Sequence, residues 1–259
     1  RRQPTPERLG ARPTRADPAA RTLEIGVTEL LLGPHGSPGF GGRGGAFGAW
    51  LGKSLHAEYQ RNAARRDPAF EAEVPLRETL AHRDWSVTLR GRADGVRKDG
   101  AGWLVEELKS GAADGDALKR VGRLQVALYA RMLEAERGGP VRAELVFIGA
   151  EPALHECVDR EPSEHALRAA LDASIDAIEA RSAAHAAARR LAAEIRFPYP
   201  ALRPGQAEIL AHVERALEQR ELLLLEAATG SGKTAAVLTP ALRFALATGR
   251  RLVVLTAST

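Results

Sequence analysis

The sequence has 259 residues, of which 44% are hydrophobic, enough for one large domain, or one domain and part of another, with a buried core. No run approaches the roughly 18 apolar residues of a membrane span, the first residues lack the apolar core of a secretory signal, and a single cysteine cannot form an internal disulfide, so we expect a cytoplasmic protein. The net charge of +4 favours a polyanionic partner only weakly, because many basic proteins bind no nucleic acid.

The first 195 residues alternate between predicted helices and strands. Residues 1–20 are rich in Pro, Arg and Ala without periodicity, and we expect a flexible arm. A short apolar stretch and a glycine-rich loop follow. Hydrophobic spacing then predicts, in chain order, a helix at 46–64, strands at 70–80, 85–96 and 102–108, a helix at 116–136, strands at 141–148 and 154–158, and a helix at 163–195. We interpret residues 21–195 as one α/β domain, with an antiparallel three-strand meander between its first two helices.

The composition changes at Phe197-Pro198-Tyr199-Pro200, where two prolines stop the long helix. We place the domain boundary there, so that residues 196–259 form a second unit. Its pattern predicts a helix at 206–220, a buried strand at 222–226, a helix at 233–247 and a buried strand at 251–256. This βαβ order indicates the start of a parallel sheet.

Two neighbouring strands of the first domain carry acids and a lysine. Alternation along 85–96 places Asp94 near the strand end, on the face opposite the apolar residues. On the next strand, Glu107 and Lys109 share a face, whereas Glu106 takes the other. We therefore prefer Glu107 to Glu106 as the acid that works with Lys109.

Acids and a lysine placed in this way suit phosphodiester hydrolysis with Mg²⁺ or Mn²⁺. Two carboxylates hold a hard cation, which polarises the phosphate and lowers the pKa of bound water. The ammonium of Lys109 then orients that water or stabilises developing negative charge. On the first helix, His56 offers a nitrogen ligand. On the second, Gln125 and Tyr129 share a face, within reach of DNA near the metal.

The ordered set Gly52-x-x-x-His56, Gly91-Arg92-Ala93-Asp94, Glu107-Leu108-Lys109 and Gln125-x-x-x-Tyr129 resembles the signature of the RecB-like branch of the PD-(D/E)xK nucleases, over roughly residues 20–190. The resemblance implies a metal-dependent nuclease whose metal is bound by Asp94, Glu107 and the backbone carbonyl of Leu108, with His56 assisting. It places the Gln/Tyr motif on the helix after the core strands. Singly, each residue also fits a turn acid, a cross-strand pair or ordinary packing; their ordered co-occurrence favours the nuclease.

The run Ala227-Ala228-Thr229-Gly230-Ser231-Gly232-Lys233-Thr234 follows a predicted strand and opens a helix, the context of a Walker A phosphate loop. Glycines let backbone N–H groups surround phosphates, Lys233 reaches the β- and γ-phosphates, and Thr234 offers a Mg²⁺ ligand. Ala227 replaces the first consensus glycine, at a position where helicases often vary. We therefore predict an ATP site made by Thr229, Gly230, Ser231, Gly232, Lys233 and Thr234.

Upstream of this loop, Phe197-Pro198-Tyr199 with Arg203 and Gln206 resembles the adenine-side entry motif of XPD/DinG-type superfamily 2 DNA helicases, and residues 251–259 resemble their next motif. The resemblance implies that Gln206 helps to bind ATP and that residues 196–259 begin motor domain 1, with its RecA-like sheet. No Walker B acid pair, arginine finger or second motor domain follows before Thr259. We expect the N-terminal part of a longer nuclease-helicase, in which the 4Fe–4S cluster common in such helicases would lie beyond Thr259.

The leading hypothesis is a metal-dependent deoxyribonuclease, expected to be an exonuclease that acts on DNA ends or single strands in repair or recombination. Two alternatives remain. One is a nuclease-like module that only binds DNA and positions a helicase. The other is an ATP-binding regulatory protein with an unrelated first domain.

Overall fold

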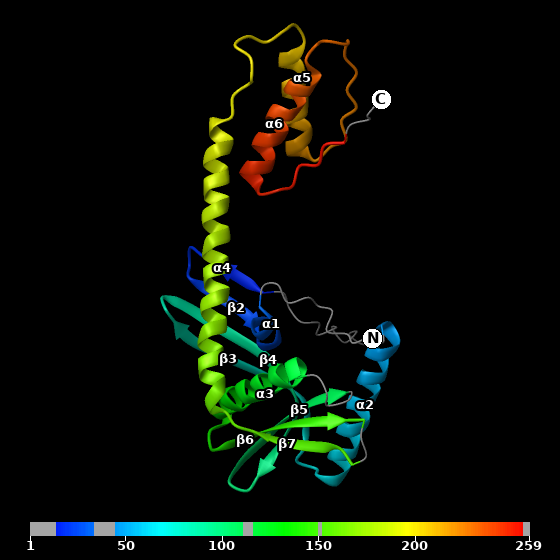
Figure 1. The fold of residues 1–259 in the computed structure, drawn as a ribbon, viewed down its shortest axis with the longest axis vertical. Coiled ribbons are helices and arrows are strands. Elements are labelled where there is room, and N and C mark those ends of the chain that lie inside the picture. The colour runs from blue at the N-terminus through cyan, green and yellow to red at the C-terminus, as the bar shows by residue number, and fades with distance from the viewer. Residues whose placement is uncertain (1–13, 34–44, 111–115, 150–151, 256–259) are drawn as a thin grey trace, which may run out of the picture. The chain divides into compact units, whose positions relative to one another are not determined.

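The computed structural model describes residues 14–33, 45–110, 116–149 and 152–255 (Figure 1). The chain divides into two compact units, Arg1–Ile178 and Glu179–Thr259. The division falls inside the long helix α4 (Glu161–Glu194), not at its end as the prolines suggested. The predicted stripe explains this position, because Leu167, Leu171, Ile175 and Ile178 are all buried in the core of the first unit, whereas residues 179–191 are mostly exposed.

The first unit contains every helix and strand predicted between residues 46 and 158. These are α2 (Gly45–Arg66), β3 (Glu71–His82), β4 (Trp85–Asp99), β5 (Gly102–Ser110), α3 (Asp116–Arg137), β6 (Val141–Ile148) and β7 (Leu154–Val158). Three earlier elements were not predicted: β1 (Arg15–Asp17), β2 (Thr22–Gly26) and the short helix α1 (Val27–Leu32). The arm expected at residues 1–20 therefore includes a strand of the sheet. The three residues of β1 have no hydrophobic pattern, and all are exposed in the structure. The strand forms because it pairs with β2.

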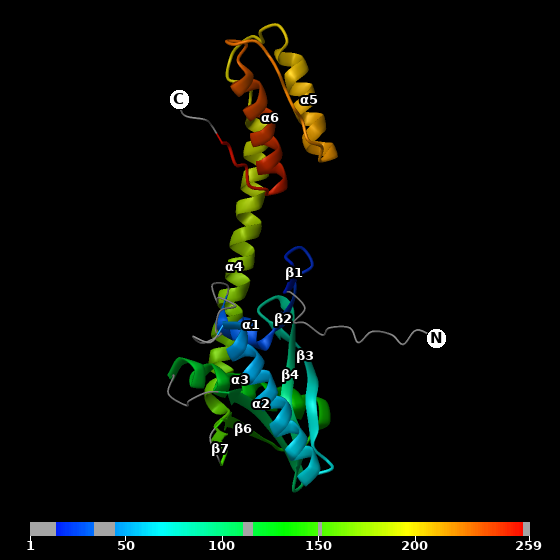
Figure 2. The same cartoon turned by 90° about the vertical axis from the view of Figure 1, so that its right-hand side faces the viewer.

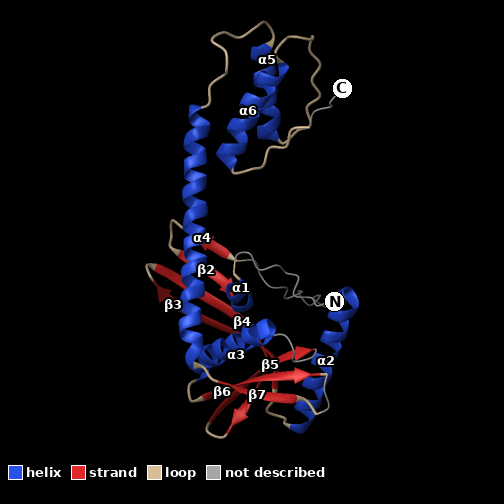
Figure 3. Cartoon of the chain, in the orientation of Figure 1, coloured by secondary structure: helices blue, strands red, loops and turns tan. Residues whose placement is uncertain are grey.

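The strands make one mixed sheet in the order β1-β2-β4-β5-β6-β7, and β3 pairs with β4 (Figure 3). The pairs β2–β4 and β5–β6 are parallel, and the others are antiparallel. One edge of β4 pairs with β3. The other edge pairs first with β2, through residues 86–90, and then with β5, through residues 95–99. Residues 91–94 lie between these two partners, in a break on that edge of β4.

Alternation along β5 sends side chains to two different packing layers. Leu108 packs with Val146 and Ile148 against Leu55 and Tyr59 of α2. Val105, by contrast, belongs to the main core with the apolar face of α3. Figure 2 shows α2 and α3 on opposite sides of the sheet. The break in β4 is therefore accessible to residues from both helices.

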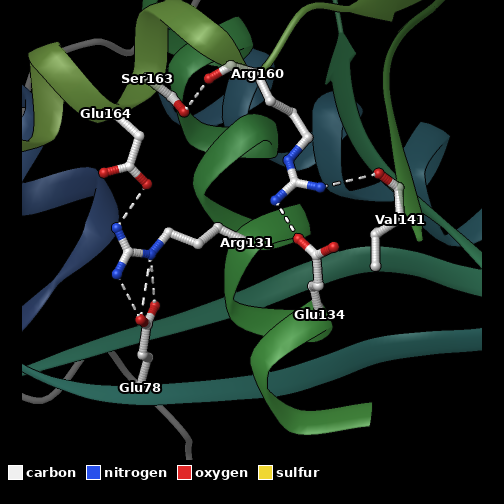
Figure 4. A network of polar contacts seen from close by, with 7 residues as sticks. All are labelled: Glu78, Arg131, Glu134, Val141, Arg160, Ser163 and Glu164. Atoms are coloured by element: carbon white, nitrogen blue, oxygen red, sulfur yellow. Dashed lines mark hydrogen bonds and ion pairs between the residues drawn. The ribbon is translucent and has the colours of Figure 1, made fainter. Parts of the chain in front are cut away.

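Arg131 fixes α3 to its neighbours (Figure 4). Its guanidinium donates to both carboxylate oxygens of Glu78 on β3, at 2.7–3.2 Å, and to Glu164 at the start of α4, at 2.7 Å. One turn later on α3, Glu134 accepts from Arg160 at 2.5 Å. Because Arg131 is about one-quarter exposed and its contact with Glu78 is bidentate, this clamp holds the helix more firmly than a single surface ion pair would.

The second unit contains α5 (Gln206–Gln219) and α6 (Lys233–Thr248), close to the predicted helices. The predicted strands are not formed: residues 222–226 and 251–255 are irregular in the described part of the chain, so the parallel sheet is not confirmed (Figure 3). Leu222 and Leu224 are 100% and 96% exposed. An apolar run satisfies the strand pattern locally, but a strand also needs a pairing partner, and these described segments have none.

None of the described helices combines the length and apolar character that a membrane crossing requires.

Candidate metal centre

The break in β4 collects the predicted acids and lysine. Asp94 is the last residue of the break and not the last residue of the strand, because β4 continues to Asp99. Its Oδ2 accepts a hydrogen bond from the backbone N–H of Leu108, at 2.7 Å. Its backbone carbonyl accepts one from the side chain of Gln60 on α2, at 2.9 Å. Leu108 and Gln60 thus hold Asp94 through its side chain and its backbone.

Glu107 points into the same region and is almost fully buried. Its Oε1 accepts from the ammonium of Lys109 at 2.7 Å, whereas its Oε2 is buried and has no hydrogen-bond partner among the described residues. Burial raises the pKa of Glu107 to about 7, with repulsion from Asp94 as a smaller cause in the same direction, and the charges of Lys109 and His56 oppose the rise. A buried carboxylate oxygen without a partner is costly, so this site has a place for a cation.

His56 reaches the site from α2. Its Nδ1 lies 3.7 Å from Oδ1 of Asp94, and both side chains are largely buried. His56 and Asp94 therefore lie together at the break, and both are near enough to Glu107 for their charges to shift its pKa. Nitrogen and carboxylate ligands of this kind suit Mn²⁺ and, through the oxygens, Mg²⁺. Leu108 contributes its backbone here, while its side chain packs on the α2 side.

Gln125 and Tyr129 extend this group into α3. The side-chain oxygen of Gln125 accepts from Lys109 at 3.2 Å, and its amide nitrogen donates to the hydroxyl of Tyr129 at 3.0 Å. Both residues are buried, and burial, together with the charge of Glu107, raises the pKa of Tyr129. The predicted pair thus lies beside Lys109 and holds it from the α3 side.

Glycines at the predicted motifs allow these close approaches. A Cβ atom at Gly91 would overlap the ring of Tyr129, so a side chain there would push the ring away from β4. A Cβ atom at Gly52 would lie 2.8 Å from the hydroxyl of Ser110, where α2 passes the end of β5. The motif glycines therefore set the distances from both helices to the sheet.

A cavity of about 700 Å³ opens at the break. Its lining includes Asp94, Glu107, Gln125 and Tyr129 and, further along the strands, Arg77, Arg90 and Arg92. Glu24 lies 3.1 Å from Arg90 and 3.5 Å from Arg77. The cavity thus joins the acids at the break to a region in which Arg77 and Arg90 are paired with Glu24.

A second group of possible ligands lies on the other side of β5. Atoms of Glu106, Glu144 and His155 lie within 4.8 Å of one another. Glu106 accepts from Arg97 at 2.9 Å and from the hydroxyl of Tyr59 at 3.3 Å, and Glu144 lies 3.0 Å from His155. Burial raises the pKa of Glu106. In contrast to Oε2 of Glu107, both oxygens of Glu106 already have partners.

In the second unit, Gln206 holds the predicted phosphate loop. Its amide nitrogen donates to the carbonyl of Ser231 at 2.8 Å, and its side-chain oxygen accepts from the backbone N–H of Arg203, also at 2.8 Å. The guanidinium of Arg203 donates to the carbonyl of Gly230 at 2.7 Å. Residues about 25 positions apart thus fix the backbone of this loop.

The loop has the backbone that its glycines permit. Gly230 and Gly232 have φ angles of 79° and 75°, in the left-handed region, and α6 begins at Lys233. The ammonium of Lys233 donates to the carbonyls of Ala227 and Ala228, at 2.5 and 2.9 Å. Thr229 lies in the turn and Thr234 in the first turn of α6, and both are exposed.

Gln60 was missed by the sequence reasoning. It lies one turn after His56 on α2 and contacts the carbonyl of Asp94 and, at 3.0 Å, the carboxylate of Glu73. Glu73 lies on β3 between Ala72 and Val74, which pair with Gly95 and Ala93 of β4, and its φ of 55° is unusual for a non-glycine residue. The spacing from His56 was the only available signal, since the contact joins residues 34 positions apart.

The comparisons with known proteins concern mainly the first unit. A family model described as the PD-(D/E)XK nuclease superfamily matches residues 48–206, which include every predicted site residue of the first unit. No curated protein matches the sequence. Chains of solved structures do match, among them the one titled "Crystal structure of SSO0001", with 17% identity and a TM-score of 0.44, over 59% of this chain and 75% of its own.

Proposed function

We propose that this chain, which belongs to the PD-(D/E)XK nuclease superfamily, is a Mg²⁺- or Mn²⁺-dependent deoxyribonuclease that acts as an exonuclease on DNA ends or single strands. Members of this superfamily are generally metal-dependent nucleases. The observation that carries the proposal is the buried Oε2 of Glu107, which has no partner among the described residues and lies beside Asp94 and Lys109. The DNA specificity and the exonuclease action are our inferences.

Each residue of the proposed metal site has its own role. Asp94, Glu107 and the backbone carbonyl of Leu108 would hold the cation, with His56 as an additional nitrogen ligand. Bound there, Mg²⁺ or Mn²⁺ supplies a Lewis acid that polarises a phosphate oxygen and lowers the pKa of water. Lys109, held between Glu107 and the side chain of Gln125, orients the attacking water and stabilises the negative charge that develops on the phosphate.

The cavity supports a nucleic-acid substrate. Arg77, Arg90 and Arg92 line it on the strands that lead to Asp94, where Glu24 pairs with the first two and Glu73 with the third. Guanidinium groups bind phosphates well, and a DNA phosphate would have to compete with these carboxylates. A cavity of about 700 Å³ has room for a short piece of one strand beside the acids but not for a duplex. This favours ends and single strands over intact duplex DNA.

The experiment is a metal titration with end-labelled linear DNA, single- and double-stranded, and with circular single-stranded DNA. The wild type is expected to release nucleotides progressively from linear strands only when Mg²⁺ or Mn²⁺ is present, and to spare the circle. Glu107→Gln is expected to abolish cleavage. Glu106→Gln is the matched control, because it changes the neighbouring acid on the other face, and it is expected to retain cleavage if the melting temperature shows that it is folded.

Each other outcome contradicts part of the proposal. Cleavage of the circle would replace exonuclease by endonuclease action. Equal losses in both glutamine variants would contradict the choice of Glu107 over the Glu106 group. Wild-type protein that binds DNA but is inert with every metal would favour the alternative, a nuclease-like module that positions a helicase.

For residues 196–259 we propose the N-terminal part of an ATP-dependent DNA helicase motor, within a nuclease-helicase of DNA repair or recombination. Gln206 and Arg203 fix a glycine-containing loop that leads into α6, and Lys233 lies against that loop. The exposed apolar segments around Leu224 and Val253 suit strands of a larger sheet. A longer polypeptide that includes further motor motifs should hydrolyse ATP in a DNA-stimulated manner, and an inert one would contradict the proposal.

A further inference from the structure

The side chain of Lys109 passes close to the helix α3 at Gly122. Gly122 is buried in the helix, one turn before Gln125, and faces the end of β5. An ideal Cβ atom at this position would lie 3.1 Å from Cε of Lys109 and 3.0 and 3.3 Å from the two Cδ atoms of Leu145. These distances are shorter than ordinary carbon–carbon contacts, so the side chains of Lys109 and Leu145 occupy the space that any other residue would need.

The helix itself gives no reason for a glycine here. Gly122 lies in the interior of α3 with a helical backbone, where glycine is less stabilising than alanine because it loses more conformational entropy on folding. The position does not end the helix, which continues to Arg137. The explanation must therefore lie in what the missing side chain leaves room for.

Of the two neighbours, Lys109 is the one that would move. Leu145 is fully buried in the main core, where displacement would disturb close packing. Cε of Lys109 is near the end of a long flexible side chain. Its ammonium lies between Oε1 of Glu107, at 2.7 Å, and the side-chain oxygen of Gln125, at 3.2 Å, and a shift of Cε would alter both hydrogen bonds.

We infer that Gly122 is a positioning residue for Lys109: by lacking a side chain it lets the lysine cross α3 and place its ammonium between Glu107 and Gln125. The inference rests on the proposed nuclease function for its effect on turnover, but the placement of the lysine is a property of the fold. Gly122, Gln125 and Tyr129 thus form one face of α3, of which the first makes room for the lysine and the second binds it.

The first experiment compares Gly122→Ala with the wild type in metal-dependent DNA cleavage. We expect kcat to fall about tenfold, less than the roughly hundredfold effect of a displacement of about 1 Å, because Cε of Lys109 has to give way by only a fraction of an ångström, while KM for DNA stays within about twofold. Unchanged kcat in the folded variant overturns the inference. A rise in KM by the same factor as the fall in kcat would show that the substitution disturbs DNA binding, and that result would also overturn the inference.

The second experiment needs no activity. The protein is acetylated under limiting reagent, and each lysine is quantified by mass spectrometry, with Lys53 and Lys98 as internal references. Lys109 is expected to react at least about threefold faster in Gly122→Ala, because the shift of its side chain weakens the hydrogen bonds of its ammonium to Glu107 and Gln125. Equal reactivity overturns the inference. If wild-type protein is inert on DNA, the proposed function fails. The ratio of the Lys109 acetylation rates in Gly122→Ala and the wild type still decides the role of Gly122.

A double-mutant cycle covers the case in which Gly122→Ala loses stability. The shift in melting temperature is measured in the wild type and in Lys109→Ala. If Lys109 is the neighbour that limits the space, the destabilisation seen in the wild type should largely disappear in Lys109→Ala. The same loss in both backgrounds would assign the conflict to Leu145 and overturn the inference.

Discussion

Glu107→Gln is expected to stabilise the metal-free protein above neutral pH. Burial raises the pKa of Glu107 from an ordinary 4.5 to about 7. Between these two pH values the folded protein holds more protons at this site than the unfolded chain does, so the stability of the wild type falls as the pH rises. The difference between the two pKa values corresponds to about 3 kcal/mol once both states are ionised. Glutamine resembles the protonated acid and avoids this cost.

The assay is urea unfolding with EDTA present, at pH 5 and pH 8. The variant should exceed the wild type by about 3 kcal/mol at pH 8, and the difference should shrink to under about 1 kcal/mol at pH 5, where the buried carboxyl is protonated. As a control, Mn²⁺ at pH 8 should stabilise the wild type and not the variant, because a ligand that binds only the folded state adds to its stability. A variant that is no more stable than the wild type at pH 8, or equally more stable at both pH values, would refute the reasoning.

Four further substitutions test the rest of the two units. Lys109→Ala should lower kcat by about 10²- to 10³-fold, while DNA binding, measured by gel shift in Ca²⁺, stays unchanged; lost binding would contradict its proposed role. Gln125→Ala should lower kcat about tenfold and, by leaving the buried hydroxyl of Tyr129 without its donor, cost about 1–3 kcal/mol in urea unfolding; unaltered stability would show that water replaces the amide. Gly91→Ala should cost about 1–3 kcal/mol because the new methyl group overlaps the ring of Tyr129, and a variant with the wild-type melting temperature would show that the ring moves freely. Lys233→Ala should abolish binding of a fluorescent ATP analogue by the longer polypeptide without changing DNA cleavage, and a parallel loss of cleavage would show that the two sites depend on each other.

Local pattern was sufficient for most elements of the first unit. The bounds of β6 and β7 agree with the prediction, although only β6 is an apolar run, and β7 carries a weaker pattern. Alternation also separated Glu107 from Glu106, because successive side chains of a strand point to opposite faces whatever the strand pairs with. In the structure, Glu107 accordingly accepts a hydrogen bond from Lys109, and Glu106 accepts one from Arg97.

Where a feature depends on distant residues, the sequence was silent or misleading. The Leu-rich residues 222–226 have the composition of a buried strand, yet they are exposed and irregular, because strands form only with a partner. Conversely, β1 lacks the pattern of a strand, because it has no apolar residue on a buried face, and it forms a strand only because it pairs with β2.

The sequence by itself therefore determined the order of helices and strands from α2 to α4 and which side chains share a face, because both follow from backbone periodicity over a few residues. Only the tertiary structure decided that β4 changes partner at residues 91–94, that Gln60 contacts the carbonyl of Asp94, and that Oε2 of Glu107 is buried without a hydrogen-bond partner among the described residues. Strand pairing and burial are set by segments far apart in the chain. The chemistry of Asp94 and Glu107 depends on that environment as much as on their identity as acids.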